Sequence, residues 1–580
     1  MARRRTGLAL RAALAGLLAF VPAMPGAVLS AQNVAGTDPY TNEVIETVQI
    51  RIANPSQDEA LNDRIEDGVR RAVSVFPGER FSQQKLDFQL AQARRIRDVG
   101  GLKYDIEPAA TGGLNIIVEV TIGETAAPEG RGMAFGGKFP TLYEKDGTYV
   151  RFKLDLFGLY YSNNNAWYGE PDQLLAGNPL VAGEPAGEGY DDWVEAYAHY
   201  GIYGITPLNE GTYVYAGVSA ITAASVGQEL FSDESRSFTG IEDAYVGIVG
   251  GNTDEDGNRF SYNVTAGRQR FTLANGFLIA NTAANGSDRA ALQANARWAS
   301  DFLGLARLRW NNTMLEVFYL DPDELPIVDS RTSYAGVNLE FQPSANLTVG
   351  TSFVTSPESD FNYFSPVGGI AGTREGLRVY DARFNYVPNG PGAQGPFFGG
   401  EIAFQDNANF DMSAHAGWAE VGYSFPRAKW SPAISYRVSK FSGDDPDTAT
   451  FERWDPMLSG GTGEQWVQGA NHFKVVQNSN VIAHRIQGRL RPMRMIELVP
   501  QLWAFRADSL NNIGGNPALT FLSDKEYGYE ANMTAKWFAS RNLYVHGHVA
   551  YTWPGDAVEA ALAGAEKGWL STMLFVRYAF

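Results

Sequence analysis

The sequence of 580 residues contains no cysteine and only 6 histidines. Without cysteine there is no disulfide framework, no thiolate-ligated zinc or iron–sulfur centre and no thiol nucleophile. Lysine and arginine number 47 against 65 aspartates and glutamates, and this acidic balance argues against nucleic acid as the main partner. Hydrophobic residues make up 44%, which is too many for a disordered chain. The 62 glycines and 12% aromatic residues favour strands and turns over helices.

Residues 1–31 have the order of a secretory signal peptide. Three arginines at positions 3–5 precede the apolar stretch Leu8–Phe20, and small residues follow at Ala27–Ala31. We predict cleavage near Ser30 or Ala31; a buried core helix is the alternative. The rest of the sequence has no run of about 20 apolar residues, which excludes a transmembrane helix there. A closed barrel can still cross a membrane, because its strands alternate between apolar and polar residues.

Residues 43–124 mix helix and strand patterns, unlike the rest of the chain. Apolar residues through Val44–Ile52 indicate a strand, and Glu59–Val75 has apolar residues at helical spacing. A second helix is expected to begin at Ser82. Two strands, Leu102–Glu107 and Leu114–Thr121, complete the unit. We therefore predict a small α/β domain.

The β–α–α–β–β order and the closing sequence LNIIVEVTIGE resemble a polypeptide-transport-associated (POTRA) module. Such a module implies a periplasmic domain that offers a sheet edge to an incoming strand of a partner protein. The alternative is a generic small α/β domain that only spaces or caps the next domain. The stretch 125–147, which contains several glycines and prolines, is expected to be a linker.

From residue 148 to residue 580 the chain repeats short alternating segments separated by polar turns. In Leu570–Phe580 the even-numbered positions are apolar or aromatic except for Thr572, and the odd-numbered positions include Arg577. Strands with lipid on one side and water on the other need this alternation, with aromatic residues near the interfaces. A large β-sandwich or propeller is the soluble alternative.

The sequence favours a large transmembrane antiparallel β-barrel. The signal peptide, the segments of about ten residues and the terminal aromatic Phe580 occur together, as expected for such barrels. The 433 residues from 148 to 580, at roughly 24 residues per strand and connection, predict about 16–18 strands and a wide aqueous channel.

The polar faces of the segments that can be assigned a phase predict a basic lumen. A lysine or arginine on the lipid face costs about 2–4 kcal/mol at the membrane midplane, so these residues are expected to point inward. The predicted inner basic residues are Arg151, Lys153, Arg307, Arg309, Arg383, Arg437, Arg485, Arg489, Arg491, Lys536 and Arg577. The predicted inner acids on the same segments are Asp155, Asp381 and Glu530. A lumen lined with arginine concentrates anions and offers bidentate contacts to carboxylates.

Other acids gather in runs that carry glycine and proline and look like loops. The runs are Glu188–Asp192, Asp254–Asp256, Asp321–Glu324 and Asp444–Asp447. We expect these runs to be solvated. In the alternative interpretation, acidic loops fold inward and pair with the arginines of the lumen.

Four segments resemble outer-membrane porins of the alginate-export family. They are residues 241–251 (IEDAYVGIVGG), 266–281 (AGRQRFTLANGFLIAN), 440–456 (KFSGDDPDTATFERWDP) and 523–556 (SDKEYGYEANMTAKWFASRNLYVHGHVAYTWPGD). The resemblance implies an 18-stranded barrel with a pore rich in arginine and lysine, which passes a polyuronate to the cell surface. The POTRA-like module departs from the family's usual layout, so another acidic polymer is an alternative substrate.

By matched motif, the resemblance assigns four residues to the pore: Arg268, Arg270, Arg453 and Arg485. Simple alternation conflicts with the first two, because Arg268 and Arg270 share the parity of Val264, which is expected to face lipid. A β-bulge near Gly267 is needed to turn them inward.

We predict an outer-membrane channel that exports an anionic polysaccharide, with the POTRA-like module docking periplasmic partners and with no cofactor. The alternative is a protein secretion or outer-membrane assembly barrel of the two-partner type. That superfamily has an Arg-Gly-Tyr or Arg-Gly-Phe motif in an inward loop, whereas the only Arg-Gly pair here, Arg131–Gly132, is followed by Met133.

An enzymatic function is not expected. There is no G-x-S-x-G motif. His546 and His548 share a strand face, but no carboxylate is spaced to complete a metal site with them.

Overall fold

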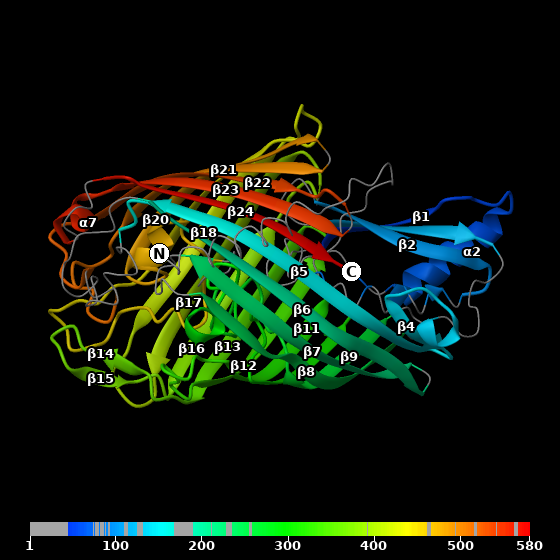
Figure 1. Cartoon of the computed structure of the whole chain (residues 1–580), viewed down its shortest axis with the longest axis horizontal. Helices are drawn as coiled ribbons and strands as arrows, with labels where there is room; N and C mark the ends of the chain where they lie inside the picture. The colour runs from blue at the N-terminus through cyan, green and yellow to red at the C-terminus, as the bar shows by residue number, and fades with distance from the viewer. Residues whose placement is uncertain are drawn as a thin grey trace, which may run out of the picture.

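The computed structural model describes residues 45–73, 75, 81, 86, 89–90, 93–94, 96–108, 114–123, 132–167, 190–209, 211–227, 235–253, 258–390, 392–460, 466–493, 495–515, 519–540, 542–561 and 567–580. The predicted signal peptide lies outside the described residues, and so do Ser82 and most of the helix expected after it. The described chain forms a small three-stranded sheet followed by a closed β-barrel (Figure 1).

The N-terminal unit is a mixed sheet with one described helix packed on it. Strands β1 (Ile45–Ile52), β3 (Leu114–Ile122) and β2 (Val99–Pro108) lie in that order, with β1 parallel and β2 antiparallel to β3. Helix α2 (Glu59–Ala72) begins after Asp58, whose carboxylate accepts backbone N–H groups of the first turn. The apolar face of α2 and alternate residues of β3 are buried together in one core. The predicted small α/β unit is therefore confirmed.

The barrel is a ring of antiparallel strands. Each strand pairs with the next in the chain, and β24 closes the ring on β5, so 18 strands of the described chain form the wall. This number is the upper end of the predicted range. The strands are β5 (Thr148–Asn164), β6 (Tyr190–Asn209), β7 (Thr212–Gly227), β8 (Arg236–Thr253), β9 (Arg259–Arg268), β10 (Phe302–Trp310), β11 (Thr313–Asp321), β12 (Ser333–Ser344), β13 (Leu347–Glu358), β16 (Leu377–Tyr386), β17 (Gly395–Asn407), β18 (Ala414–Ser424), β19 (Ala433–Phe441), β20 (Val481–Met493), β21 (Ile496–Arg506), β22 (Glu526–Trp537), β23 (Leu543–Pro554) and β24 (Trp569–Ala579).

A further strand extends the wall at the seam of the ring. Strand β4 (Thr141–Lys145) lies within the stretch predicted as a linker and pairs with the first residues of β5, whereas β24 pairs with the rest of β5. The turn between β4 and β5 is Asp146–Gly147, and both residues have positive φ, of 50° and 83°. A two-residue turn with both φ values positive matches the twist of paired strands, and Asp-Gly favours it.

The remaining elements lie in the connections. They are the β14 (Asn362–Phe364) and β15 (Ile370–Thr373) hairpin, the 3-10 turns η1 (Met133–Phe135) and η2 (Ser287–Arg289), and the short helices α6 (His472–Val476) and α7 (Asp556–Ala561). None of the helices in the described part of the chain has the length and apolar character needed to cross a bilayer.

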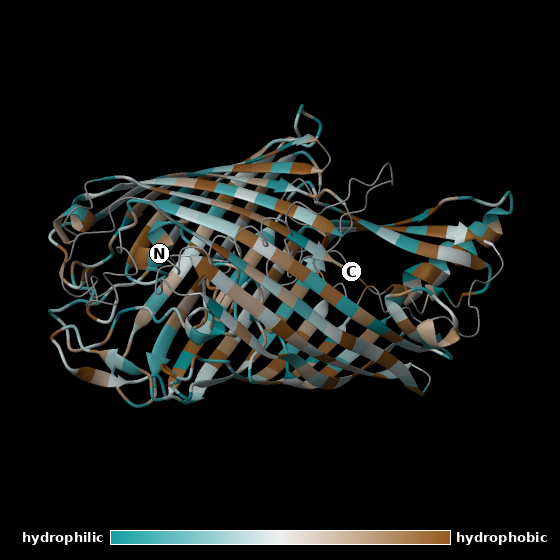
Figure 2. Ribbon diagram, viewed as in Figure 1, coloured by the Kyte–Doolittle hydropathy of each residue, from teal (hydrophilic) through white to brown (hydrophobic). Residues whose placement is uncertain are grey.

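The outer surface of the barrel is apolar at alternate positions of its strands. Trp310 is 63% exposed, Leu502 58%, Ile402 54% and Leu574 51%. Figure 2 shows the resulting bands of hydrophobic and hydrophilic residues across the wall. Large apolar side chains exposed over a whole cylinder would be unfavourable in water, and this pattern is typical of barrels whose outside contacts lipid.

The two ends of the barrel differ in their connections. Strands β10 and β11 are joined by residues 311–312, and β12 and β13 by residues 345–346. The opposite ends of the strands carry long connections, such as 269–301 and 442–480. The small sheet lies beyond the end with short turns, where the chain also ends (Figure 1). We refer to the two ends as the short-turn end and the long-loop end.

Candidate transport path

Alternate residues of each strand face the barrel interior, and β20 illustrates this arrangement. Arg485 is 9% exposed, whereas the next residue, Ile486, is 49% exposed on the outer surface. Arg489 and Arg491 share the parity of Arg485, and both guanidinium groups lie within 4 Å of the Glu497 carboxylate on β21. The three arginines of β20 therefore lie on the inner face of the wall.

A group of charges that we name the Glu497 cluster lies near the short-turn end. The carboxylate of Glu497, on a side chain only 3% exposed, is 3.2 Å from Arg491, 3.7 Å from Arg489 and 3.9 Å from the ammonium of Lys536. The three cationic side chains are themselves 15–23% exposed. Three positive charges and one negative charge leave a formal surplus of two positive charges, which faces the lumen at this end.

A second surplus of positive charge lies on the same wall, nearer the long-loop end. The Arg485 guanidinium is 2.7 Å from the Glu420 carboxylate, and Arg485 faces Arg437 across the β19–β20 pair. The Arg437 guanidinium lies over two indole rings, 4.7 Å from the centroid of Trp466 and 5.5 Å from that of Trp503. Cation–π contacts with these rings offset part of the repulsion between the two arginines.

Cations on the other strands pair with acids of the same strand or of a neighbouring strand. Arg383 donates to Asp381 at 2.7 Å and to Glu340 on β12 at 2.9 Å. Arg307 forms an ion pair with Glu316, its direct partner across the β10–β11 pair. These groups contain at least one acid for each arginine, so they leave no surplus of positive charge.

The seam between β24 and β5 carries a buried ion pair. Both Arg577 and Asp155 have side chains only 1% exposed, and the guanidinium contacts the carboxylate through two nitrogens. Arg151 and Lys153 share the parity of Asp155 on β5 and so lie on the same inner face. Arg309 has the inward parity of Arg307 and donates to the carbonyl of residue 311 at 3.2 Å.

The inner wall carries more carboxylates than the sequence pattern identified. Asp155, Asp381 and Glu530 do face inward, with exposures of 0%, 4% and 1%. Further inner acids lie on strands or at positions whose phase was not assigned from the sequence: Glu195, Glu242, Asp243, Glu316, Glu340, Glu401, Glu420 and Glu497. Positive charge is therefore offset over much of the wall, and its surplus is concentrated in a few places.

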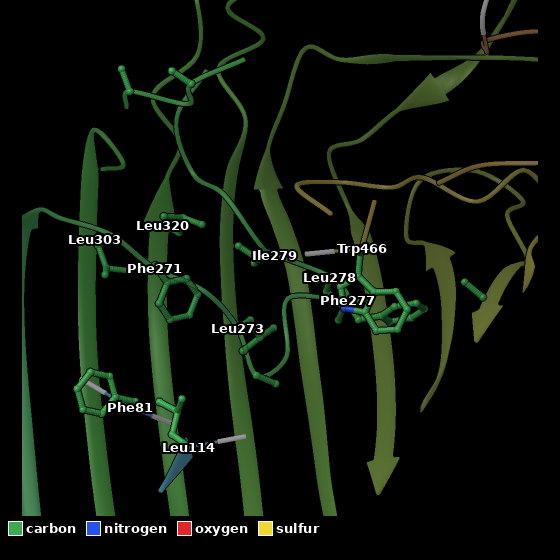
Figure 3. Close-up of a cluster of buried hydrophobic side chains, with 14 of the residues drawn as sticks. Phe81, Leu114, Phe271, Leu273, Phe277, Leu278, Ile279, Leu303, Leu320 and Trp466 are labelled. Atoms are coloured by element: carbon green, nitrogen blue, oxygen red, sulfur yellow. The ribbon is translucent and has the colours of Figure 1, made fainter. Parts of the chain in front are cut away.

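Two connections fold into the barrel interior, and we name them the inner segments, 269–301 and 442–480. They meet where Ile279 and Leu458 form a parallel β-bridge. The ring of Phe277 lies in a buried apolar cluster between the segments and the wall (Figure 3). The inner segments therefore narrow the lumen with an apolar core of their own.

Three wall glutamates hold the inner segments through main-chain hydrogen bonds. The N–H groups lie 2.5–3.2 Å from the carboxylate oxygens, at residues 293–294 for Glu195, 298–299 for Glu242 and 470–472 for Glu530. A carboxylate that accepts several N–H groups satisfies both its own charge and the polar backbone of a buried segment. No sequence pattern indicated this role.

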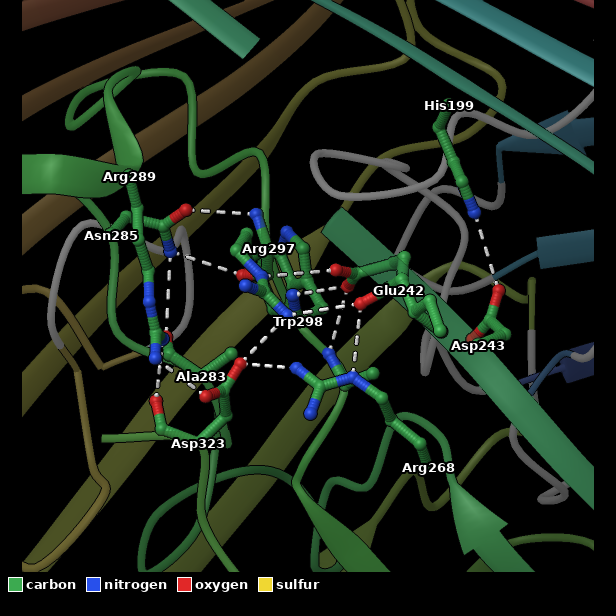
Figure 4. A network of polar contacts seen from close by, with 12 residues as sticks. His199, Glu242, Asp243, Arg268, Ala283, Asn285, Arg289, Arg297, Trp298 and Asp323 are labelled. Carbon is green, nitrogen blue, oxygen red and sulfur yellow. Dashed lines mark hydrogen bonds and ion pairs between the residues drawn. The ribbon is translucent and has the colours of Figure 1, made fainter. Parts of the chain in front are cut away.

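Arg268 belongs to a network that fixes the first inner segment at the long-loop end (Figure 4). The carboxylate of Asp323, on a side chain 4% exposed, receives the guanidinium groups of Arg268, Arg289 and Arg297. Arg268 also pairs with Asp301. Arg270 follows at the start of the segment, with its guanidinium 5.5 Å from the centroid of the Trp298 ring.

The expected bulge lies on the neighbouring strand and not at Gly267 itself. On β8, Glu242 and Asp243 together face the single residue Ser219 of β7. Two consecutive residues are thereby buried inside the barrel, next to the end of β9. Gly267 has a φ of 128°, after which the chain leaves the wall and Arg268 reaches Asp323 inside.

Arg453 lies in the second inner segment and not on a strand. It donates to the carbonyl of Gly514 at 2.9 Å, so it joins two connections at the long-loop end.

The expectation that the acidic runs are solvated is wrong for two of their members. Asp323 is buried among arginines, and Asp444 is 1% exposed. Burial and the negative charge of nearby Glu452 raise the pKa of Asp444 to about 6. The run at 254–256 lies outside the described residues.

A buried group of His199, Ser219 and Asp243 is not a hydrolytic triad. The same imidazole nitrogen, Nε2, lies 2.8 Å from the Ser219 oxygen and 3.2 Å from the Asp243 carboxylate. A triad needs the carboxylate on the other ring nitrogen, so that Nε2 can act as the base. Among the described residues there is also no group of three histidine or acidic side chains that could hold a metal ion.

A model of a protein family described as alginate export matches residues 222–567. The match covers more than half of the 580 residues and 14 complete strands of the wall. The chain belongs to the alginate export family. It is an outer-membrane β-barrel channel of that family, which is a transport family and not a family of enzymes.

Solved structures of Pseudomonas aeruginosa channels are similar to this alginate export family member. OccK2 (OpdF) is 8% identical, with 74% of this chain and 97% of that chain covered and a TM-score of 0.45. OprD is 12% identical, with 74% and 95% covered and a TM-score of 0.43. OccK5 (OpdH) is 9% identical, with 74% and 98% covered and a TM-score of 0.43. No curated protein matches the chain.

Proposed function

We propose that this channel exports an anionic polysaccharide, such as an alginate-like polyuronate or a related acidic glycan. The proposal rests mainly on the Glu497 cluster, where three partly exposed cations surround one carboxylate near the short-turn end. A surplus of positive charge in a narrow aqueous passage raises the local concentration of anions. Guanidinium groups also form two parallel hydrogen bonds with one carboxylate, which suits a chain that carries a carboxylate on each sugar.

The short-turn end is the entry side in this proposal. Short turns face the periplasm in outer-membrane barrels, whereas long loops face the outside. An acidic glycan arriving from the periplasm would meet Arg489, Arg491 and Lys536 first and then pass Arg485 and Arg437. The inner segments would then control the passage, because they occupy the interior towards the long-loop end.

The N-terminal sheet is proposed to dock periplasmic partners. Among the described residues, β1 and β2 pair only with β3, so each has one edge without a strand partner. Such an edge can accept a strand of another protein through main-chain hydrogen bonds. A POTRA-like role in protein secretion or assembly is the second candidate function, favoured by the β1–β3–β2 order of this sheet ahead of a barrel.

Ion selectivity of the purified channel in planar lipid bilayers tests the proposed function. Under a salt gradient, we expect a reversal potential that indicates preference for anions. A cation-selective channel would remove the proposal. Deletion of residues 43–124 separates the two candidates: loss of a surface protein with normal glycan export would favour secretion or assembly.

A further inference from the structure

Tyrosine and glycine alternate across the inner faces of strands β6–β9. Tyr203 on β6 faces Gly217 on β7, which in turn faces Tyr245 on β8. One row nearer the short-turn end, Tyr215 on β7 faces Gly247 on β8. The three tyrosines have the inward parity of their strands and are partly exposed. Because they face the interior, that exposure is to the lumen.

The glycines let the tyrosine rings approach the wall closely. A Cβ atom on Gly217 would lie 2.7 Å from the ring of Tyr203 and 2.8 Å from that of Tyr245. A Cβ atom on Gly247 would lie 2.6 Å from the ring of Tyr215. Contacts this short are possible only because glycine has no side chain. The rings of Tyr215 and Tyr245 meet edge to face, with their centroids 6.0 Å apart and their planes at 64°.

The hydroxyl groups fix the orientation of two of these rings. Tyr203 donates to the Asp243 carboxylate at 2.7 Å, and Tyr215 donates to the side-chain oxygen of Asn263 at 2.6 Å. The Asp243 carboxylate also accepts a hydrogen bond from Ser219 at 2.8 Å, so its charge is engaged within the wall. The hydroxyl groups of Tyr203 and Tyr215 therefore have partners within the wall.

Positive charge lies beside the tyrosines on the next strand. Arg151 on β5 faces Tyr203 directly, and the ammonium of Lys153 is 5.7 Å from the centroid of the Tyr203 ring. A sugar ring that packs its C–H face on a tyrosine would thus have cationic groups within reach of a substituent at its edge.

We propose that Tyr203, Tyr215 and Tyr245 form a stacking subsite for the sugar rings of the transported glycan, which we name the tyrosine platform. This inference rests on the proposed function and adds to it a contact with the neutral part of each sugar. Flat aromatic faces bind apolar faces of ligands by dispersion and by exclusion of water. The neighbouring Arg151 and Lys153 favour uronate residues over neutral sugars.

A matched control lies on the same wall. Phe318 on β11 also covers a glycine, since a Cβ atom on Gly336 would lie 2.6 Å from its ring. Phe318 is 3% exposed, because Phe271 of the first inner segment packs on it with ring centroids 4.7 Å apart. Its ring has the geometry of the platform tyrosines without their exposure to the lumen.

The test uses the full chain in planar bilayers and measures current blockade by a short oligouronate and by a neutral oligosaccharide of the same length. The variants are Y203L/Y215L/Y245L, Y203F/Y215F/Y245F and F318L. We expect the leucine variant to need about tenfold more oligouronate for half-maximal block. The phenylalanine variant keeps the rings and should differ from the wild type by less than about twofold. F318L should block like the wild type.

The outcomes separate the platform from the proposed function. Unchanged block in the leucine variant, with oligouronate still blocking better than the neutral sugar, would overturn the platform and leave the function intact. Equal loss in the leucine and phenylalanine variants would also overturn it, because hydroxyl groups and not ring faces would then bind. A wild-type channel that oligouronate does not block would remove both. Single-channel conductance shows that each variant has formed the barrel.

Discussion

Charge reversal in the Glu497 cluster should reverse the ion preference of the channel. We predict this for R489E/R491E, in which two of the three cations around Glu497 become carboxylates. In the wild type the cluster has three positive charges and one negative charge, whereas the variant has one and three. The formal charge therefore changes by four units, from plus two to minus two.

The size of the effect follows from Coulomb's law. Two unit charges about 8 Å apart in water interact by about 0.5 kcal/mol. Four units then change the free energy of a monovalent anion at the cluster by about 2 kcal/mol, which is about thirtyfold in relative anion permeability. Screening over about 8 Å at 0.15 M salt should reduce this change to a few fold, whereas about 0.01 M salt should preserve it.

The assay is the reversal potential across planar bilayers at low and at physiological salt. The matched control is R64E/R70E, which makes the same change of charge at two exposed arginines of helix α2, outside the barrel. We expect no change of selectivity in the control. Equal selectivity of R489E/R491E and the wild type at low salt would refute the idea that this cluster sets the ion preference.

Three further predictions concern the inner segments and the seam. E530Q should weaken the hold on residues 470–472 and raise protease cleavage of segment 442–480, whereas unchanged cleavage would contradict this role. D155A should cost about 3–5 kcal/mol, because it leaves Arg577 buried without its partner; a wild-type urea midpoint would contradict this. Because the pKa of Asp444 is raised to about 6, protonation favours the folded loop as pH falls from above 6 towards 4. After correction for the intrinsic pH dependence of amide exchange, the protection factors of the loop amides should rise over that range in the wild type but not in D444N.

The barrel was predictable because its two surfaces impose opposite requirements. On β24 the residues on the lipid side are apolar or aromatic except for Thr572, and Arg577 on the other side is 1% exposed. The same alternation predicted the inward parity of Arg485, Arg489 and Arg491. One face of such a strand must avoid water and the other tolerates charge. The alternation of apolar and charged residues along the strand therefore shows which residues face the lumen.

Alternation fails where the inner face is itself apolar. On β11 the inner residues Glu316, Phe318 and Leu320 include two large apolar side chains, because the first inner segment packs on them. Strand β11 is then apolar on both faces, so its sequence does not show which residues face the lumen. Its inner acid, Glu316, could therefore not be predicted. The inner segments themselves have no strand or helix pattern long enough to predict where they fold.

The network around Asp323 was beyond prediction for a different reason. It joins Arg268, Arg289 and Arg297 to an acid from the connection between β11 and β12, and such contacts depend on tertiary placement. The bulge that brings Glu242 and Asp243 inside together also breaks the period of two. The tyrosine platform depends on cross-strand register between Tyr203, Gly217 and Tyr245, which local composition does not encode.

Release of a labelled oligouronate from liposomes tests export of an acidic glycan most directly. Liposomes with and without the reconstituted channel are loaded with the oligouronate or with a neutral oligosaccharide of the same length, and efflux is followed over time. We predict channel-dependent efflux that is faster for the oligouronate than for the neutral sugar. Efflux of the neutral sugar at an equal or higher rate would contradict transport selected by the cationic lumen.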